Sequence, residues 1–215
     1  MHGDSILIED HHRKAAAEIV ELILPRIGQA KRFTLSVAGE SGSGKSEMAA
    51  ALAEALDQNG LPAVIFGQDD YFVYPPKSND RARRQDIGWV GLQEVNLSLL
   101  DRHLGAFHAG RASIIKPLVI YDTDSITTED MALNGARIAI AEGTYTTMLD
   151  QADIRIFIDR DYSQTRAHRE KRNRNAAELD SFVDGVLTIE HDIISAHKPR
   201  ADIIINKDYS VTHDH

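Results

Sequence analysis

The sequence predicts an α/β fold in which a parallel central sheet is covered by helices on both faces. Two observations support this prediction: short apolar runs alternate with longer segments of helical periodicity, and several runs end at glycine or at acidic residues. Strands that alternate with helices pair in parallel, and ligands bind beyond the carboxyl ends of such strands. We therefore expect functional side chains at that edge of the sheet.

Length and composition limit the class of protein. The chain has 215 residues, 42% of them hydrophobic, which fits one compact domain with its own core. It has no cysteine, which excludes disulfides and suits a reducing cytoplasm. A formal net charge of -9 argues against a nucleic-acid partner, because phosphate backbones bind basic surfaces. The apolar run within residues 1–10 is too short for a signal peptide or a membrane span. We expect a cytoplasmic protein that binds neither nucleic acid nor membrane.

Apolar periodicity predicts the order of the elements. Helices are expected at 10–30, 45–58, 92–109 and 183–196, with a further arginine-dense helix from about Ser163. Strands are expected at 33–38, 63–67, 114–120, 138–141, 154–158 and 203–205. The stretch 73–91 is rich in Pro, Asp, Arg and Gly without a steady period, which predicts an irregular connection long enough to serve a site.

A glycine-rich motif lies between the first predicted strand and the helix that follows it. Its residues, a complete GxxxxGK[ST] pattern, are Gly39, Glu40, Ser41, Gly42, Ser43, Gly44, Lys45 and Ser46. Glycines permit positive φ values and leave backbone N–H groups free to bind phosphate oxygens at the start of a helix. Lys45 is expected to reach the β and γ phosphates, and Ser46 to bind Mg²⁺. The motif predicts a three-layer P-loop NTPase fold with ATP and Mg²⁺ as cofactors.

A nucleotide site does not identify the reaction, since GTPase switches, ATPases and small-molecule kinases all have one. A guanine-reading NKxD motif is incomplete, because Tyr209 ends the segment that begins at Asn206. Asp69 and Asp70 follow the strand at 63–67, where a carboxylate could accept the proton of an acceptor hydroxyl. Side chains alternate along an extended segment, so we expect one of the two aspartates to face the cleft. The alternative for this pair is a solvated turn or a helix cap.

Four segments, in their order along the chain, resemble the uridine kinase and phosphoribulokinase family: Gly39–Ser46, Gln68–Phe72, Pro117–Asp122 and Glu142-Gly143. The resemblance covers most of the chain and implies a kinase that transfers the γ-phosphate of ATP to a hydroxyl group of a small molecule. It implies that Asp69 is the catalytic base and that Ser46, Glu142 and Asp69 bind Mg²⁺. Asp70 would then be the neighbour that assists the metal.

This family closes a basic lid over the phosphates, and the resemblance places the lid at about 160–182. Arg166 and Arg169 lie there at a spacing that can share one helix face. By the resemblance they stabilise charge on the transferring phosphoryl group, whereas the alternative is a solvated charged face. Residues 1–215 would form one P-loop kinase domain, with 1–30 as an N-terminal helical extension.

The acceptor is left open by the sequence. Uridine kinases follow their Tyr-Asp pair with Phe-x-Thr-His, but here the histidine is missing after Tyr121. We expect Asp69, Tyr71, Asp86 and Tyr121 to line the acceptor site, with Asp86 holding a sugar hydroxyl. Three arginines of the long connection fit either a phosphorylated acceptor or a surface of balanced charge: Arg81, Arg83 and Arg84.

Several alternatives therefore stay open. The acceptor is either a nucleoside, a sugar phosphate or another small alcohol, and a nucleotide-dependent switch without an acceptor is the alternative outside the kinases. The adjacent histidines at 11–12 and the pair in 213–215 lack the spacing that aims several ligands at one ion, so we expect no specific metal site there. The sequence does not indicate an oligomeric state, and a homo-oligomer is compatible with it.

Overall fold

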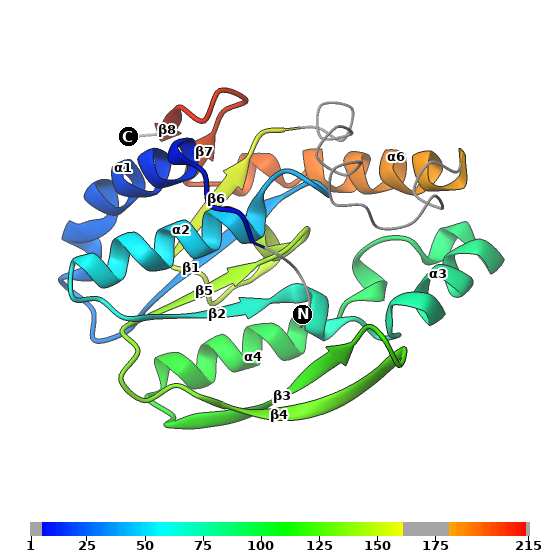
Figure 1. Cartoon of the computed structure of the whole chain (residues 1–215), viewed down its shortest axis with the longest axis horizontal. Coiled ribbons are helices and arrows are strands. Elements are labelled where there is room, and N and C mark those ends of the chain that lie inside the picture. The colour runs from blue at the N-terminus through cyan, green and yellow to red at the C-terminus, as the bar shows by residue number, and fades with distance from the viewer. Residues whose placement is uncertain (1–5, 161–180, 214–215) are drawn as a thin grey trace.

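The computed structural model describes residues 6–160 and 181–213 (Figure 1). Within them, the central sheet has the strand order β2-β5-β1-β6-β7-β8. The strands are β1 (Phe33–Gly39), β2 (Ala63–Gly67), β5 (Ile138–Glu142), β6 (Ile154–Ile158), β7 (Ile203–Ile205) and β8 (Val211–His213). The first five strands in this order pair in parallel, and β8 pairs antiparallel with β7 at the edge. The predicted parallel sheet is thus confirmed, and β8 is an addition that the sequence did not indicate.

Strand β1 lies at the centre of the sheet. Its residue Leu35 is in register with Ile140 of β5 on one side and with Ile154 of β6 on the other. Every residue of β1 is buried. Parallel strands covered on both faces read as near-continuous apolar runs, which is the pattern that made this strand predictable.

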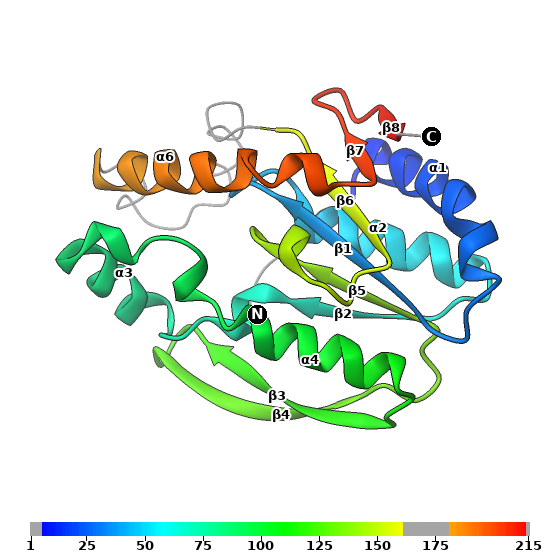
Figure 2. The same cartoon turned by 180° about the vertical axis from the view of Figure 1, so that it is seen from behind.

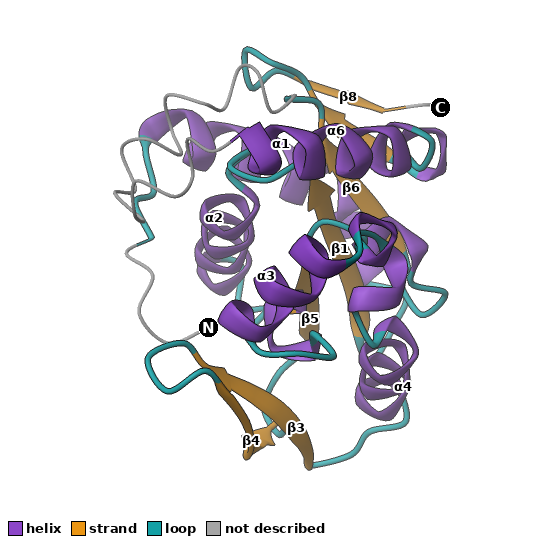
Figure 3. Cartoon of the chain, turned by 90° about the vertical axis from the view of Figure 1, so that its right-hand side faces the viewer, coloured by secondary structure: helices purple, strands orange, loops and turns teal. Residues whose placement is uncertain are grey.

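Helices cover both faces of the sheet, as the edge-on view in Figure 3 shows. On one face, α1 (Asp10–Ile27) and α2 (Lys45–Gln58) pack in a core cluster with Leu35 and Ile140. On the other face, α4 (Leu97–His108) packs in a second cluster with Phe66 and Phe157. Helix α6 (Ser181–Ser195) adds Ile194 to this second cluster and lies above α3 in Figure 2. The three-layer α/β prediction is confirmed.

The prediction of an irregular connection at 73–91 is wrong in one respect. The segment contains α3 (Pro76–Gln85), followed by a short 3₁₀ helix at Ile87–Trp89. Asn79 is the one residue of α3 that is buried, so this helix has no apolar periodicity to reveal it. Proline at the first helical position was the signal available, since its missing N–H is not needed there.

The predicted strand at 114–120 is present as β3 (Ser113–Ile120), but it does not join the central sheet. It pairs antiparallel with β4 (Ser125–Ala132), and Ile120 stands opposite Ser125 next to the turn. The resulting hairpin lies beside α4 in Figures 1 and 2. The alternation of strands and helices was therefore misleading at this point, because a hairpin can leave the sheet and form a separate wall.

The turn of this hairpin supports the start of α3. Asp124, with a positive φ of 48°, accepts hydrogen bonds from the backbone N–H groups of Lys77 at 2.7 Å and Ser78 at 3.2 Å. The first N–H groups of a helix have no partner within the helix, and a carboxylate near them also interacts favourably with the positive end of the helix dipole. Desolvation acts to raise the pKa of Asp124, but the hydrogen bond from the Ser78 hydroxyl, at 2.7 Å, and the two backbone hydrogen bonds lower it on balance. The hairpin and α3 are thereby held together over more than forty positions of sequence.

The predicted arginine-dense helix from about Ser163, and most of the predicted lid, lie outside the described residues. In the part of the chain that the structure describes, no helix has the length and apolar character needed to cross a membrane.

Candidate active site

The glycine-rich loop Gly39–Ser46 joins the end of β1 to the first turn of α2, as predicted. Gly42 and Gly44 have φ values of 76° and 95°, which other residues rarely adopt. Helix α2 begins at Lys45, so the N–H groups of its first turn, which have no carbonyl partner within the helix, lie at the loop and favour an anion. The ammonium group of Lys45 donates to the carbonyl oxygen of Glu40 at 2.8 Å, which places its charge within the loop.

Two carboxylates lie beside this loop, at the carboxyl ends of neighbouring strands. Gly67, the last residue of β2, is in register with Glu142, the last residue of β5, and Asp69 follows two positions after Gly67. Burial and, after it, the charge of Asp69 raise the pKa of Glu142 to about 7, whereas the charge of Lys45 acts in the opposite direction. Two carboxylates and one ammonium group therefore share a single site.

The oxygen groups of this site fit Mg²⁺. A cavity of about 450 Å³ is bordered by Ser46, Asp69 and Glu142. Mg²⁺ binds one or two carboxylates together with phosphate oxygens and water, and a P-loop hydroxyl is a further ligand that this arrangement offers. A divalent cation would also relieve the repulsion between the two carboxylates that raises the pKa of Glu142.

A second cavity, of about 250 Å³, adjoins the first. Ser41 of the glycine-rich loop, Asp69 and Thr144 border it at one end, and Tyr121 of the hairpin turn and Glu190 of α6 border it elsewhere. Asp69 is on the wall of both cavities. Asp69 therefore borders both the space beside Ser46 and Glu142 and the space beside Tyr121 and Glu190.

The sequence profile of the phosphoribulokinase / uridine kinase family matches residues 34–212 of this chain. The chain belongs to this family. This is a family of P-loop kinases, and membership implies the use of ATP with Mg²⁺ in general.

Relatives within and near the family differ in acceptor. A bifunctional alpha-galactosidase/sucrose kinase of Mediterraneibacter gnavus is 28% identical over 84% of this chain and 20% of its own length. A uridine kinase of Leuconostoc citreum (strain KM20) is 23% identical over 81% of this chain and 87% of its own length. Uridine-cytidine kinase-like 1 of Mus musculus is 28% identical over 72% of this chain. The chain spans only 20% and 28% of the sucrose kinase and the mouse protein, so family membership does not determine the substrate.

Solved structures show the same fold. A candidate fructose transport system kinase from Silicibacter sp. TM1040 superposes with a TM-score of 0.68 at 20% identity, covering 84% of this chain and 94% of that chain. D-glycerate 3-kinase from Cryptococcus neoformans superposes with a TM-score of 0.60 at 13% identity, covering 99% of this chain and all of that chain. Kinases named for different acceptors thus share this architecture.

The structure gives the two neighbouring aspartates different partners. Asp70 accepts hydrogen bonds from Lys116 Nζ at 2.7 Å and from Val119 N at 3.1 Å, and its side chain is almost fully buried. Its carboxylate therefore anchors the hairpin. Asp69 is the one of the pair that borders both cavities. The expectation of an extended segment is wrong, because Gln68–Tyr71 is a short 3₁₀ helix. Both aspartates border the first cavity and Asp69 also borders the second, so the expectation that only one of them faces the cleft stays a prediction.

Two of the residues expected at the acceptor site lie elsewhere. Tyr71 is 1% exposed, and its hydroxyl group bonds with His103 Nδ1 at 2.8 Å in the core. Burial raises the pKa of Tyr71 above its ordinary value. Asp86 is exposed and accepts a hydrogen bond from Gly88 N at 2.9 Å, and neither residue borders either of the two cavities. Arg166 and Arg169 lie outside the described residues.

Helix α6 contributes side chains to the site that the sequence did not indicate. Glu190 of this helix borders the second cavity, and His191 Nδ1 lies 2.6 Å from Glu40 Oε1 of the glycine-rich loop. Burial raises the pKa of Glu190, and the charges of Arg83 and Lys45 lower it. No local pattern distinguishes Glu190 from other helix-surface carboxylates, so sequence reasoning had no signal for it.

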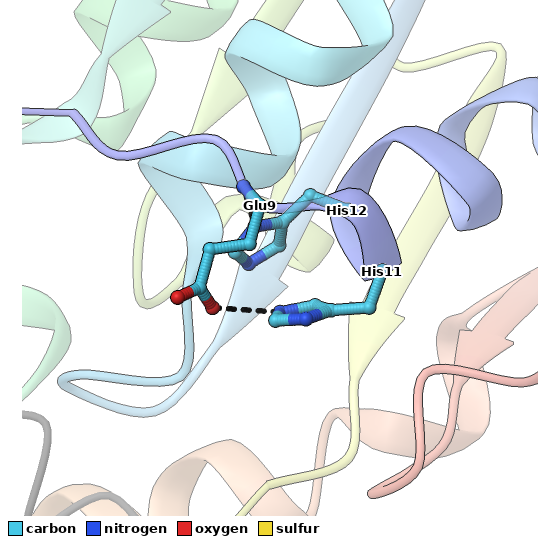
Figure 4. Close-up of side chains that lie close together, drawn as sticks. All are labelled: Glu9, His11 and His12. Carbon is cyan, nitrogen blue, oxygen red and sulfur yellow. Dashed lines mark hydrogen bonds and ion pairs between the residues drawn. The ribbon is translucent and has the colours of Figure 1, made fainter.

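Glu9, His11 and His12 form a cluster that the sequence analysis did not expect to have ligand spacing (Figure 4). One ligand atom from each lies within 4.8 Å of the others. The backbone N–H of Glu9 donates to His12 Nδ1 at 3.0 Å, which caps α1 and puts the proton of the neutral ring on Nε2. His11 stacks on Tyr209 with ring centroids 3.9 Å apart. Capping and stacking account for this arrangement.

Proposed function

We propose that the protein transfers the γ-phosphoryl group of ATP to a hydroxyl group of a small metabolite, such as a nucleoside or a related compound, with Asp69 as the base. The observation that carries this proposal is the position of Asp69 on the wall of both cavities. A base must lie close to both the acceptor hydroxyl and the phosphorus that the hydroxyl attacks. A nucleotide switch has no need of the second cavity.

In the proposed mechanism, the backbone N–H groups of Gly39–Ser46 and the ammonium group of Lys45 bind the triphosphate. Ser46, Glu142 and Asp69 would hold Mg²⁺, which when bound neutralises charge on the phosphates during transfer. The charge of Lys45 acts to lower the pKa of both Glu142 and Glu190, so its ammonium group lies within electrostatic range of both carboxyl groups.

The acceptor occupies the second cavity in this proposal. Its hydroxyl oxygen forms the new bond to the γ-phosphorus as the bond to the β-γ bridging oxygen breaks, and Asp69 takes the hydroxyl proton. Tyr121, which is 37% exposed at the hairpin turn, lines the cavity and can cover a bound ring. That Arg166 and Arg169 stabilise the charge on the phosphoryl group during transfer stays a prediction.

The experiment compares Asp69→Asn with the wild type on a panel of nucleosides, sugars and small alcohols, with ADP production and product formation both measured. Asparagine keeps the shape but cannot take the proton, so transfer should fall by about a hundredfold or more. ATP affinity, measured by calorimetry, should stay within about threefold, because the glycine-rich loop is unchanged. Asp57→Asn, on the exposed side of α2, is the control and should behave as the wild type. Full transfer by the Asp69 variant would refute the role of the base, and hydrolysis that no acceptor accelerates would refute the kinase proposal.

A further inference from the structure

We propose that the second cavity takes an uncharged polyhydroxy acceptor, either a free sugar or the sugar part of a nucleoside, and excludes acceptors that already carry a phosphate. This inference rests on the proposed function, because it takes the cavity beside Asp69 as the acceptor site. The sequence left two roles open for the arginines at positions 81, 83 and 84: binding a phosphorylated acceptor, or forming a surface of balanced charge. The inference excludes the first role.

Two of these arginines are paired with carboxylates and are not among the residues that line the second cavity. Arg81 Nη2 lies 3.4 Å from Asp124 Oδ2, at the turn that caps α3. Arg84 Nε lies 2.9 Å from Asp80 Oδ2 across one turn of the helix. Neither arginine borders the second cavity, whereas Asp80 does. These guanidinium groups balance acidic side chains and do not offer a phosphate site.

Arg83 is the one cation among the described residues that border the cavity. Its Nε donates to Glu94 Oε1, and its Nη2 donates to Glu94 Oε2 at 2.7 Å and to Glu190 Oε1 at 2.9 Å. The Arg83 side chain is 18% exposed, and those of Glu94 and Glu190 are 0% and 11% exposed. One guanidinium between two carboxylates leaves a net negative charge in a poorly solvated place, where like charges repel strongly.

A network holds Arg83 in this arrangement. Asn79 Nδ2 donates to Glu94 Oε1 at 3.1 Å, and Asn79 Oδ1 accepts a hydrogen bond from Trp89 Nε1 at 2.9 Å. The backbone N–H of Gly91 also donates to Glu94, at 3.2 Å. If Arg83 turned toward a phosphate, the fully buried carboxylate of Glu94 would lose its charge partner, which is strongly unfavourable. The guanidinium group is therefore a positioning element that fixes Glu190 on the cavity wall.

The remaining wall suits hydroxyl groups. Asp69, Asp80 and Glu190 provide carboxylate oxygens, which accept strong hydrogen bonds from sugar hydroxyls. Phe72 and Tyr121 provide ring faces for the C–H surface of a sugar or for a base. The ammonium group of Lys77 lies 5.7 Å from the centre of the Tyr121 ring. It donates a hydrogen bond to the carbonyl oxygen of Asp122 at 3.3 Å, and neither Lys77 nor Asp122 lines the cavity.

The test measures kcat/KM for matched pairs of acceptors with and without a phosphate: free hexoses and pentoses against their monophosphates, and nucleosides against nucleoside monophosphates. The free member of the best pair should be preferred by at least about tenfold, since like-charge juxtaposition at a binding site costs that much or more. The sugar and nucleoside arms identify the source of the polyhydroxy group.

Two variants test the cause of this preference. Glu190→Gln keeps an oxygen for Arg83 and removes one negative charge, and Asp80→Asn removes another without touching the Arg83 network. Each variant should lower the ratio of kcat/KM for the free acceptor to kcat/KM for the phosphorylated one by roughly tenfold. Glu21→Gln, exposed on α1, is the matched control and should leave the preference unchanged. A purely structural role for Glu190 would lower activity on both members of a pair equally, and the melting temperature of each variant separates loss of fold from loss of selectivity.

The outcomes are distinguishable. A preference for phosphorylated acceptors, or an unchanged preference in both charge variants when these are folded, would overturn the inference and leave the proposed kinase function standing. If no compound of either kind accepted a phosphate, the proposed function would fail and the inference with it. A preference for free acceptors that both variants narrow would support the inference.

Discussion

Lys116 of β3 binds Asp70 with 2.7 Å between Nζ and Oδ2, and both side chains are 5% exposed. The same ammonium group lies 2.6 Å from Glu129 Oε1 of β4. The segment that carries the proposed base is thus tied to a hairpin that is not part of the central sheet. The position of Asp69 depends on this pair, because Asp69 and Asp70 belong to one short 3₁₀ helix.

We predict that Lys116→Met destabilises the protein by about 3 kcal/mol, because removal of one partner leaves a buried charge without compensation. Urea unfolding at neutral pH measures this loss. The double variant Lys116→Met with Asp70→Asn should recover part of it, since the buried charge is then absent. Equal stability of Lys116→Met and the wild type would show that the pair does not anchor the hairpin.

For the nucleotide site, we predict that Lys45→Ala weakens ATP binding by roughly tenfold to a hundredfold, the range expected when hydrogen bonds to a charged group are lost. The transfer rate should fall as well, because the lysine reaches the phosphoryl group in transfer. Calorimetry and steady-state kinetics measure the two effects separately. Lys14→Ala, exposed on α1, serves as the control. Unchanged affinity together with an unchanged rate would contradict the assigned role.

The pKa of Glu142 predicts a pH dependence of stability in the absence of metal and nucleotide. Its pKa is about 7 in the folded chain against an ordinary value of 4.5, so the folded state keeps a proton that the unfolded state releases. Stability should therefore fall as the pH rises from about 4.5 to 7. Glu142→Gln should remove this decrease of stability with pH. At pH 8, with a chelator present, the variant should be more stable than the wild type by up to roughly 3 kcal/mol.

Urea unfolding at pH 5 and pH 8 checks this prediction, with Glu18→Gln on the exposed face of α1 as the control. The gain should shrink toward pH 4.5 and vanish below it, where the unfolded wild type also becomes protonated at Glu142. The same variant should lose the extra stability that Mg²⁺ adds to the nucleotide complex of the wild type. Parallel pH profiles for wild type and Glu142→Gln would contradict the raised pKa.

Gly143 follows Glu142 and contacts Gln68, the neighbour of Asp69. A Cβ atom at Gly143 would lie 2.2 Å from Gln68 Cβ, and Gln68 Oε1 accepts a hydrogen bond from Tyr145 N at 2.8 Å. We predict that Gly143→Ala costs about 1–3 kcal/mol, because the buried side chain must shift, and that it also lowers activity by displacing Asp69.

Gly185→Ala is the matched control for that substitution. A Cβ atom there meets nothing within 4 Å, and Gly185 lies inside helix α6. Alanine should therefore stabilise the protein by about 0.5–1 kcal/mol through its higher helix propensity. Thermal unfolding of both variants measures the contrast, and equal effects of the two substitutions would show that the contact with Gln68 does not matter.

Much of the sheet was predictable because buried parallel strands carry their signal locally. The strands predicted at 63–67, 154–158 and 203–205 coincide with β2, β6 and β7, and the helix predicted at 45–58 coincides with α2. Helix α3 and the hairpin were not predictable in the same way. The stability of α3 comes from a cap provided by Asp124, and this contribution leaves no periodicity in the sequence of α3 itself.

The sequence by itself determined the glycine-rich loop, the strands and helices with clear apolar periodicity, and the family, because these depend on residues that are neighbours along the chain. Only the tertiary structure decided which of the two aspartates borders both cavities and which arginine of the connection is held between two carboxylates. Asp70 meets its partner at position 116, and Arg83 meets Glu94 and Glu190. Ion pairs over such separations form when packing brings distant elements together, and local patterns carry no information about them.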